Sequence, residues 1–347
     1  MARLTSDIVW LVEQEVTLPD GRTVTALVPK IYVAVKPSDL LPTGALISAN
    51  SMDLKLTGDL HNSGTIAGRN VVQINAQNLN NLGAIVGNQL NLNATNDLNN
   101  IGGVLQANTS ASLQAGHDVN IQTTTRTTTG STSTGSNFSN TIIDRVAGIY
   151  VGDGSTDTST TSLLVRAGND VNLNAAVIHN AGQGNSAIIA QNNVNLGAVQ
   201  TQTTDNKVWD AQNYRKQTIT TDVGSSINTT GNLLISGNNI SAVATDINSE
   251  TGQTVLKASK DINLIAGKTT DQYSDKSHSE SSGLLSSSQH DQNSTHNTSD
   301  SIASNVTGAK VLIDAGKDIN ITGSNVVSDT QTMLIADNNI NITAAQN

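Results

Sequence analysis

One short pattern, a strand, a tight turn and a second strand, recurs seven times along this chain. Its clearest copy spans residues 311–322, where an apolar run leads into a polar turn and Ile319 and Ile321 then alternate with Asn320 and Thr322. Alternation with a period of two is typical of a half-buried strand. The other copies lie at 113–121, 164–173, 188–196, 233–241, 256–264 and 334–342. No enzyme motif in the sequence is as strong as this repeat.

The spacing of the copies predicts the architecture. Counted from the Asp or Asn before the second strand, copies are 23 residues apart from Asp170 to Asn193 and 21 apart from Asp318 to Asn339. A fixed period of this size indicates a solenoid. Each unit has short strands, no helical periodicity and turns of Gly, Asn and Asp. We therefore predict an all-β solenoid rather than a helical repeat.

Stacking explains how so short a unit can be stable. Stacked units pair strand on strand at about 4.8 Å per coil, so a dozen or so coils would make a rod roughly 60 Å long. The inward apolar side chains, Ile262 and Ile319 among them, would form one continuous core. We also expect equivalent Asn side chains to hydrogen-bond along the stack, the alternative being that they point outward into water. These residues are Asn120, Asn172, Asn195, Asn263, Asn320 and Asn341.

Composition narrows the classes of function. Aromatic residues are only 2% of the 347 residues, which suits a narrow interior filled by Ile, Val, Leu and Ala. The formal net charge of -10 argues against binding nucleic acid, which requires neutralisation of phosphates. The absence of Cys excludes disulfides and thiolate metal sites. The sequence has no apolar run long enough to span a membrane. It also has no segment with the pattern of a signal peptide. We expect the chain to be a segment of a longer protein.

The first 44 residues differ from the repeats. Residues 8–18 alternate, 19–22 form a hairpin turn, and 23–28 and 31–35 return as strands before a linker at 37–44. We expect a β-hairpin module over 1–44 that caps the first coil through Trp10. A docking face for a preceding domain is the alternative.

Regular coils are predicted over residues 45–122. The corner sequences 62–64, 81–83 and 100–102 each read Asn-x-Gly, and the apolar triplets after them begin at Ile66, Ile85 and Val104, which are 19 residues apart. We expect each Asn-x-Gly corner to supply a left-handed turn conformation.

Residues 123–347 are predicted to be paired coils interrupted by three inserts, at about 123–161, 203–228 and 269–307. All three are rich in Ser and Thr, and each leaves the coil after a Thr-rich strand end. The second insert carries Trp209, Tyr214, Arg215 and Lys216. Insertions in a solenoid gather on one flank, which is often a binding flank. The alternative is that the inserts are disordered or loosely paired β segments that bind no partner.

The sequence offers little chemistry. Asp118, Asp170, Asp261 and Asp318 recur at repeat corners, and Asn replaces Asp at 193, 239 and 339, an interchange that a turn role predicts and a catalytic role does not. His278, His290 and His296 lie in the third insert, near several carboxylates, with a spacing that matches no metal template. The nearby carboxylates are Asp275, Glu280, Asp291 and Asp300. The sequons at Asn108, Asn228 and Asn297 follow from the composition. We predict no catalytic, cofactor-binding or metal-binding residues.

Two stretches resemble a known family. Residues 7–35 with the coil sequence that follows, and the third repeat with its insert at 255–288, resemble the large haemagglutinin-repeat exoproteins of Gram-negative bacteria. These are the filamentous haemagglutinins and the contact-dependent growth inhibition toxin-delivery proteins, exported by two-partner secretion. The later stretch is particularly similar to the family's second class of haemagglutinin repeat.

The resemblance implies a right-handed parallel β-helix, a place at the cell surface and no catalysis. It implies as partners the outer-membrane transporter used in export, a target-cell outer membrane or surface receptor, and flanking domains of the parent chain. In the growth-inhibition members such a region helps carry a C-terminal toxin across the target outer membrane, whereas in the haemagglutinins it is the shaft of an adhesin. The resemblance leaves both alternatives open.

Overall fold

The computed structural model describes residues 8–17, 23–32, 44–133, 135–152 and 161–346, and every regular element in them is a strand. The chain divides into a unit at Met1–Leu46 and a unit at Ile47–Asn347. The described residues include no helix that could cross a membrane. The all-β class is thus confirmed.

The first unit contains one antiparallel pair, β1 (Ile8–Thr17) and β2 (Thr23–Tyr32). We predicted two strands after the turn, but β2 continues through Pro29, which pairs with Leu11. A two-stranded ribbon leaves one edge of each strand unpaired, so a residue without an N–H can be accommodated. The turn at 19–22, most of the linker and the Trp10 side chain lie outside the described residues.

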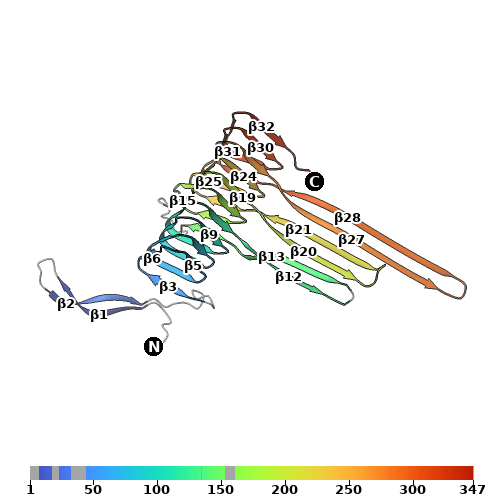
Figure 1. Cartoon of the computed structure of the whole chain (residues 1–347), viewed down its shortest axis with the longest axis horizontal. Coiled ribbons are helices and arrows are strands. Elements are labelled where there is room, and N and C mark those ends of the chain that lie inside the picture. The colour runs from blue at the N-terminus through green and yellow to red at the C-terminus, as the bar shows by residue number, and fades with distance from the viewer. Residues whose placement is uncertain (1–7, 18–22, 33–43, 134, 153–160, 347) are drawn as a thin grey trace. The chain divides into compact units, whose positions relative to one another are not determined.

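The second unit is a stack of coils (Figure 1). Each coil has three walls, because the long strands of one sheet are divided by a shift of register and a second sheet adds the third wall. The first two walls form a fourteen-stranded sheet and the third wall a ten-stranded sheet, and from β4 onward the strands pair in parallel. The fourteen strands are β3 (Leu46–Ala49), β4 (Met52–Lys55), β6 (Thr65–Ala76), β8 (Ala84–Ala94), β10 (Val104–Ala115), β14 (Gly148–Val151), β15 (Ser162–Ala167), β17 (Val177–Asn180), β18 (Ser186–Ala190), β22 (Ser226–Thr229), β23 (Leu233–Gly237), β25 (Asp246–Ala258), β29 (Asn305–Ala315) and β31 (Asn325–Ala336). The third wall comprises β5 (Leu60–Asn62), β7 (Leu79–Asn81), β9 (Leu98–Ile101), β11 (Val119–Gln122), β16 (Val171–Asn174), β19 (Asn193–Gly197), β24 (Asn239–Val243), β26 (Ile262–Ile265), β30 (Asp318–Thr322) and β32 (Asn339–Thr343).

The long strands bend from the first wall to the second at a shift of register, for example between Gly68 and Val71 in β6. The repeat found in the sequence is therefore the end of the second wall, a corner and the third wall. The ten strands of the third wall define ten coils in the described part of the chain, fewer than the dozen or so expected.

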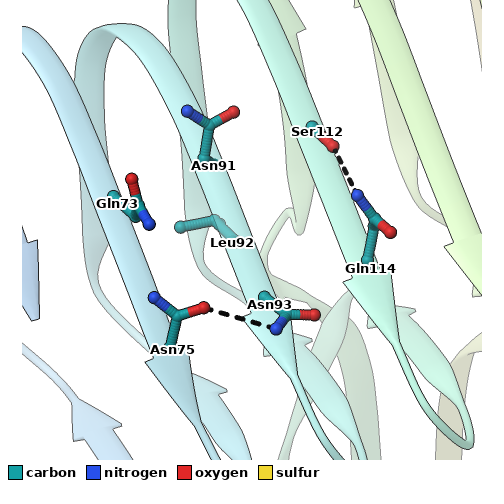
Figure 2. Close-up of a pocket in the computed structure, with 7 residues that line it drawn as sticks. All are labelled: Gln73, Asn75, Asn91, Leu92, Asn93, Ser112 and Gln114. Carbon is teal, nitrogen blue, oxygen red and sulfur yellow. Dashed lines mark hydrogen bonds between the residues drawn. The ribbon is translucent and has the colours of Figure 1, made fainter. Parts of the chain in front are cut away.

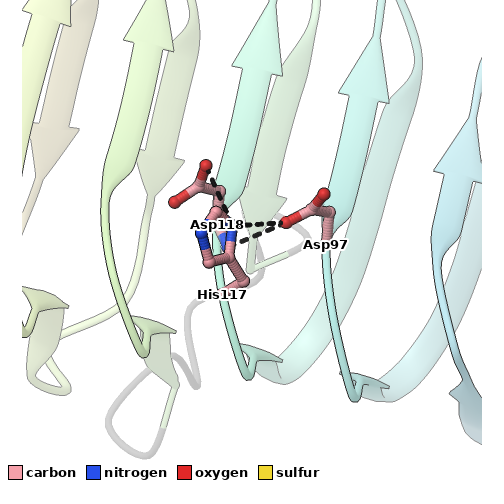
Figure 3. Close-up of side chains that lie close together, drawn as sticks. All are labelled: Asp97, His117 and Asp118. Carbon is pink, nitrogen blue, oxygen red and sulfur yellow. Dashed lines mark hydrogen bonds and ion pairs between the residues drawn. The ribbon is translucent and has the colours of Figure 1, made fainter.

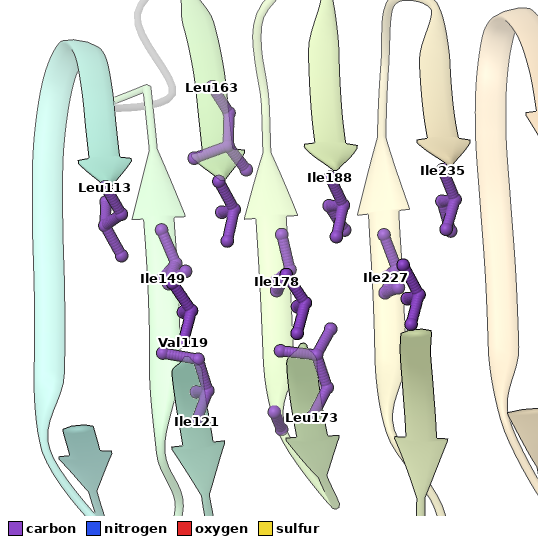
Figure 4. Close-up of a cluster of buried hydrophobic side chains, with 14 of the residues drawn as sticks. Leu113, Val119, Ile121, Ile149, Leu163, Leu173, Ile178, Ile188, Ile227 and Ile235 are labelled. Carbon is purple, nitrogen blue, oxygen red and sulfur yellow. The ribbon is translucent and has the colours of Figure 1, made fainter. Parts of the chain in front are cut away.

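The core runs along the inside of the stack (Figure 4). Alternate residues of all three walls point inward, as shown by Ile149 on the first wall, Leu113 on the second and Ile121 on the third, each 0% exposed. Ile262 and Ile319 are also fully buried, which confirms their predicted inward orientation. Each coil contributes only a few apolar side chains, so burial depends on the neighbouring coils above and below.

The predicted Asn ladder is confirmed on the outer surface of the third wall. Asn120 donates to Asn99 at 2.8 Å, Asn172 to Asn120 at 2.8 Å and Asn195 to Asn172 at 2.8 Å. Ser241 then interrupts the ladder, which resumes from Asn263 through Asn320 to Asn341. The side chains are half-buried, except that of Asn341, which is exposed. Both alternatives therefore hold in part: the amides point outward, and they also bond to one another.

The Asn-x-Gly corners differ from the prediction in two respects. Asn62, Asn81 and Asn100 are buried and form a second ladder, with amide contacts of 2.7 Å, and among these corners only Gly102 has a positive φ, +61°. In addition, Leu105, not Val104, pairs with Ile85, because the third corner carries the extra Gly103. A one-residue slip reverses which side chains face inward, and Leu105 is fully buried.

Each predicted insert overlaps one antiparallel hairpin, and together these form a six-stranded sheet on one side of the stack (Figure 1). The second and third hairpins begin slightly before the predicted inserts, at Val199 and Gly267. The strands are β12 (Thr124–Ser131), β13 (Asn137–Arg145), β20 (Val199–Val208), β21 (Tyr214–Val223), β27 (Gly267–Ser282) and β28 (Ser287–Ile302). The inserts end earlier than predicted, because β14, β22 and the start of β29 are first-wall strands. The first-wall strand that follows each hairpin buries few large apolar residues, for example Ile149, Ile227 and Val306. One such residue is too weak a pattern to reveal a strand in the sequence.

Candidate functional site

Two features of the coil stack combine polar groups in a regular way. The first is the corner between the second and third walls, where every coil has Asp or Asn immediately before or at the start of its third-wall strand. We call these residues the corner column: Asp59, Asn78, Asp97, Asp118, Asp170, Asn193, Asn239, Asp261, Asp318 and Asn339. The second feature is the six-stranded hairpin sheet.

The corner column binds one coil to the next. The Asp97 carboxylate accepts the backbone N–H of Asp118 at 3.1 Å, and the Asp118 carboxylate accepts that of Asp170 at 3.0 Å. The same bond recurs at every step except that from Asn193 to Asn239, where the Asn239 amide is the donor. Only a side-chain oxygen is required, and Asn and Asp both supply one. This confirms the turn role predicted from their interchange.

Stacked carboxylates repel one another, and two basic side chains offset this repulsion. The Nδ1 atom of His117 lies 3.0 Å from Oδ1 of Asp97 and 3.2 Å from Oδ2 of Asp118 (Figure 3). Lys317, at the equivalent position of a later coil, lies 3.5 Å from Asp261 and 3.2 Å from Asp318. The hydrogen bond to Asp97, with the charge of Asp118, raises the pKa of His117 above its ordinary value of 6.5.

The trio of Asp97, His117 and Asp118 is the one group in the described chain whose ligand atoms lie close enough to share a metal ion. A metal is not needed to explain it. Lys317 makes the same bridge between two corner carboxylates, and a protonated lysine cannot ligate a metal. A protonated His117 accounts for the geometry in the same way, so we assign the trio a structural role.

The raised pKa of His117 predicts a pH dependence. Because folding strengthens proton binding, the stabilisation is complete below the unfolded pKa of about 6.5 and is lost as the pH rises through the folded pKa. NMR titration should place the pKa of His117 above that of an unfolded reference peptide, and Asp97→Asn should lower it. His117→Lys should remove the pH dependence of this contact. A wild-type pKa at or below 6.5 would contradict the bridge.

A shallow groove crosses the outer surface of the second wall (Figure 2). It has a volume of about 350 Å³, and its lining is almost entirely amides and a hydroxyl from three successive coils, such as Asn75, Asn93 and Gln114. Asn93 donates to Asn75 at 3.3 Å and Gln114 to Ser112 at 3.3 Å, so part of this polar surface is already paired. Ligand pockets are usually concave and mainly apolar, which this groove is not.

The hairpin sheet is held together by hydroxyl and amide pairs rather than by an apolar core. Thr220 bonds to Thr270 at 2.6 Å and Thr221 to Thr269 at 2.8 Å across β21 and β27. A buried hydroxyl lies where the third hairpin returns to the first wall: the Ser304 hydroxyl donates to the Ile265 carbonyl at 2.7 Å. β12 and β28 are the two edges of the sheet, and the β28 side chains are almost all exposed. The inserts are thus ordered strands rather than loose excursions.

The histidines of the third insert do not form one cluster. His278 lies between Asp291, on the opposite strand, and Glu280, whose Oε1 is 3.1 Å from Nε2. The hydrogen bond to Asp291 raises the pKa of His278. His290 pairs with Ser279, and His296 stacks on Tyr273 with ring centroids 4.8 Å apart. Asp275 and Asp300 pair with other residues of the hairpin.

The remaining residues noted in the sequence lie on the surface. Asn108, Asn228 and Asn297 are exposed, and Asn228 accepts a hydrogen bond from Asn248 at 2.7 Å. Tyr214 lies beside Lys216, whose Nζ is 4.8 Å from the ring centroid. Trp209, at the turn of the second hairpin, is 64% exposed.

The most exposed apolar residues of the described chain are not among those singled out from the sequence. Leu284 and Leu285, at the turn of the third hairpin, are 101% and 97% exposed. They interrupt a long polar segment, and two adjacent leucines in such a context were a signal that could have been recognised. Phe138, near the turn of the first hairpin, is 48% exposed and covers Gly130 on the paired strand.

Comparison with known families supports the resemblance. Residues 209–286 and 283–347 match the family model described as Hemagglutinin repeat. The two matched stretches cover the later coils and the third hairpin, and they support the haemagglutinin-repeat family for this part of the chain. No curated protein and no solved structure matches the chain.

Proposed function

We propose that this chain is a non-catalytic, right-handed β-helical segment of a large secreted exoprotein at the surface of a Gram-negative cell, exported through an outer-membrane transporter of two-partner secretion. The observation that carries the proposal is a stack of ten parallel coils whose later part matches the Hemagglutinin repeat. Proteins of that family are secreted cell-surface exoproteins. The corner column and the Asn ladders use polar side chains to join coils, which supports a structural role for them.

Within that class we propose a toxin-delivery role, in which the segment helps move a C-terminal toxin across the target outer membrane. The hairpin sheet supports this role, because its polar faces and its free edge strand β28 stand away from the coils. The alternative is the shaft of a filamentous haemagglutinin-type adhesin. It is supported by the continuous core from Met52 to Ile321, which suits a rigid spacer.

A deletion separates the two roles. Residues 45–347 are removed from the full-length parent, and surface binding and entry of the C-terminal cargo are measured on target cells. Retained binding with lost entry supports delivery. Loss of binding supports the adhesin, and restoring the length with unrelated β-helical coils then distinguishes a binding surface from a spacer. Cleavage of acidic polysaccharides by the purified chain would contradict the non-catalytic assignment.

A further inference from the structure

The tip of the third hairpin is the least covered apolar site of the described chain. The turn between β27 and β28 is closed by a hydrogen bond from the Gly283 N–H to the Ser286 carbonyl at 2.7 Å. Leu284 and Leu285 occupy the two positions between them, with side chains almost completely open to solvent. Single exposed apolar residues are ordinary on protein surfaces, but these two leucines are adjacent and fully open, and together they form a small apolar patch that is available to a partner.

The surroundings of the tip are small, polar and uncharged. Residues 281–289 contain only Ser, Gly, Leu and Gln, and the nearest charged groups are Glu280 on one strand and Asp291 on the other. The tip also stands clear of the neighbouring hairpin, since the pairing of β21 with β27 ends at Tyr214 and Lys276. Six further residues of β27 therefore extend toward the turn with β28 as their partner.

The other two hairpins also carry a large apolar residue near the turn. These are Phe138 in the first hairpin and Trp209 in the second, both substantially exposed. All three hairpins belong to one sheet and project on the same side of the coils (Figure 1). The apolar residues are thus presented at the outer ends of long polar arms.

We propose that Leu284 and Leu285 insert into the apolar region of a lipid bilayer. Stable protein interfaces bury about 800 Å² on each partner, which a two-residue tip does not supply, whereas a bilayer accepts apolar side chains without shape complementarity. Ser residues on both sides suit the headgroup region. The net charge of -10 favours a zwitterionic surface over an anionic one. Insertion is limited to the turn, since the unpaired edge of β28 would leave its backbone groups unsatisfied in hydrocarbon.

This inference names a partner for the proposed function and rests on its cell-surface location, but not on toxin delivery. The experiment is flotation of the full chain with phosphatidylcholine vesicles. Wild-type protein should float with the lipid. Replacing both leucines by Ser should reduce the lipid partition coefficient at least a hundredfold, about 2.8 kcal/mol at 1.4 kcal/mol per tenfold change. Replacing both by Ile should preserve flotation, and so should Val327→Thr, which alters an exposed apolar residue elsewhere.

A second readout locates the contact. In a Trp10→Phe, Trp209→Phe background, Leu285→Trp places the single tryptophan at the tip, and its fluorescence should be quenched by brominated lipid. Absence of wild-type flotation, equal flotation of the Ser variant, or an unquenched tip tryptophan would each overturn the proposal. The first outcome would leave a protein pocket as the partner. Because the assay contains no cargo and no target cell, its failure is distinguishable from failure of the delivery role.

Discussion

Replacing Ile262 by Asp should destabilise the coil stack by several kcal/mol. Ile262 is 0% exposed and lies between Ile240 and Ile319 of the neighbouring coils. A carboxylate there would be buried without a partner, and it would also leave part of the volume of the isoleucine unfilled. In a solenoid the loss falls on two coil interfaces at once. Urea unfolding followed by far-UV circular dichroism should show the decrease.

The adjacent residue provides a matched control. Asn263 is half-buried on the outer face of the same strand, and its side-chain oxygen accepts a hydrogen bond from Asn320 at 2.9 Å. Asp at this position keeps the acceptor, so Asn263→Asp should change the free energy of unfolding by less than about 1 kcal/mol. If both variants unfold at the wild-type urea concentration, the inward assignment of Ile262 is wrong. If both are equally destabilised, an added charge is harmful on either face.

The sequence predicts the coil stack because the same short-range requirement is repeated in every coil. The coils have apolar residues at alternate positions and an oxygen acceptor at the corner, such as Asp170 or Asn193. Both features recur often enough to be found from their spacing alone. The hydrogen bonds that result join residues one coil apart, such as Asn195 to Asn172. Their register follows directly from the repeat length.

Other features depend on a single residue or on distant contacts, and the repeat does not predict them. The extra Gly103 shifts Leu105 into register with Ile85, which a fixed 19-residue period cannot show. The first-wall strands β14 and β22 both pair with β17, and in each case the partner residues lie far apart in the sequence. The hairpin sheet is held by polar pairs that leave no apolar periodicity, and the exposure of Leu284 depends on how far its hairpin extends.

Gly83→Ala should also be strongly destabilising, and for a different reason. A Cβ atom at this corner would lie 2.0 Å from the Gly64 carbonyl oxygen of the preceding coil, and neither is part of a flexible side chain. The two coils would have to move apart where the buried Asn62 and Asn81 amides bond at 2.7 Å. Overpacking of this kind costs about 1–3 kcal/mol.

Gly58→Ala is the matched control, because a Cβ atom there would meet nothing within 4 Å. This change should be neutral or should stabilise the protein by about 0.4–1 kcal/mol, since Ala restricts the unfolded chain. Comparison of the two urea midpoints separates close approach between coils from the general effect of removing a glycine. Equal midpoints would show that the corner tolerates a wider coil spacing. In that case Gly83 would not be required by contact with Gly64, and the tight stacking of the Asn-x-Gly corners would not contribute to stability.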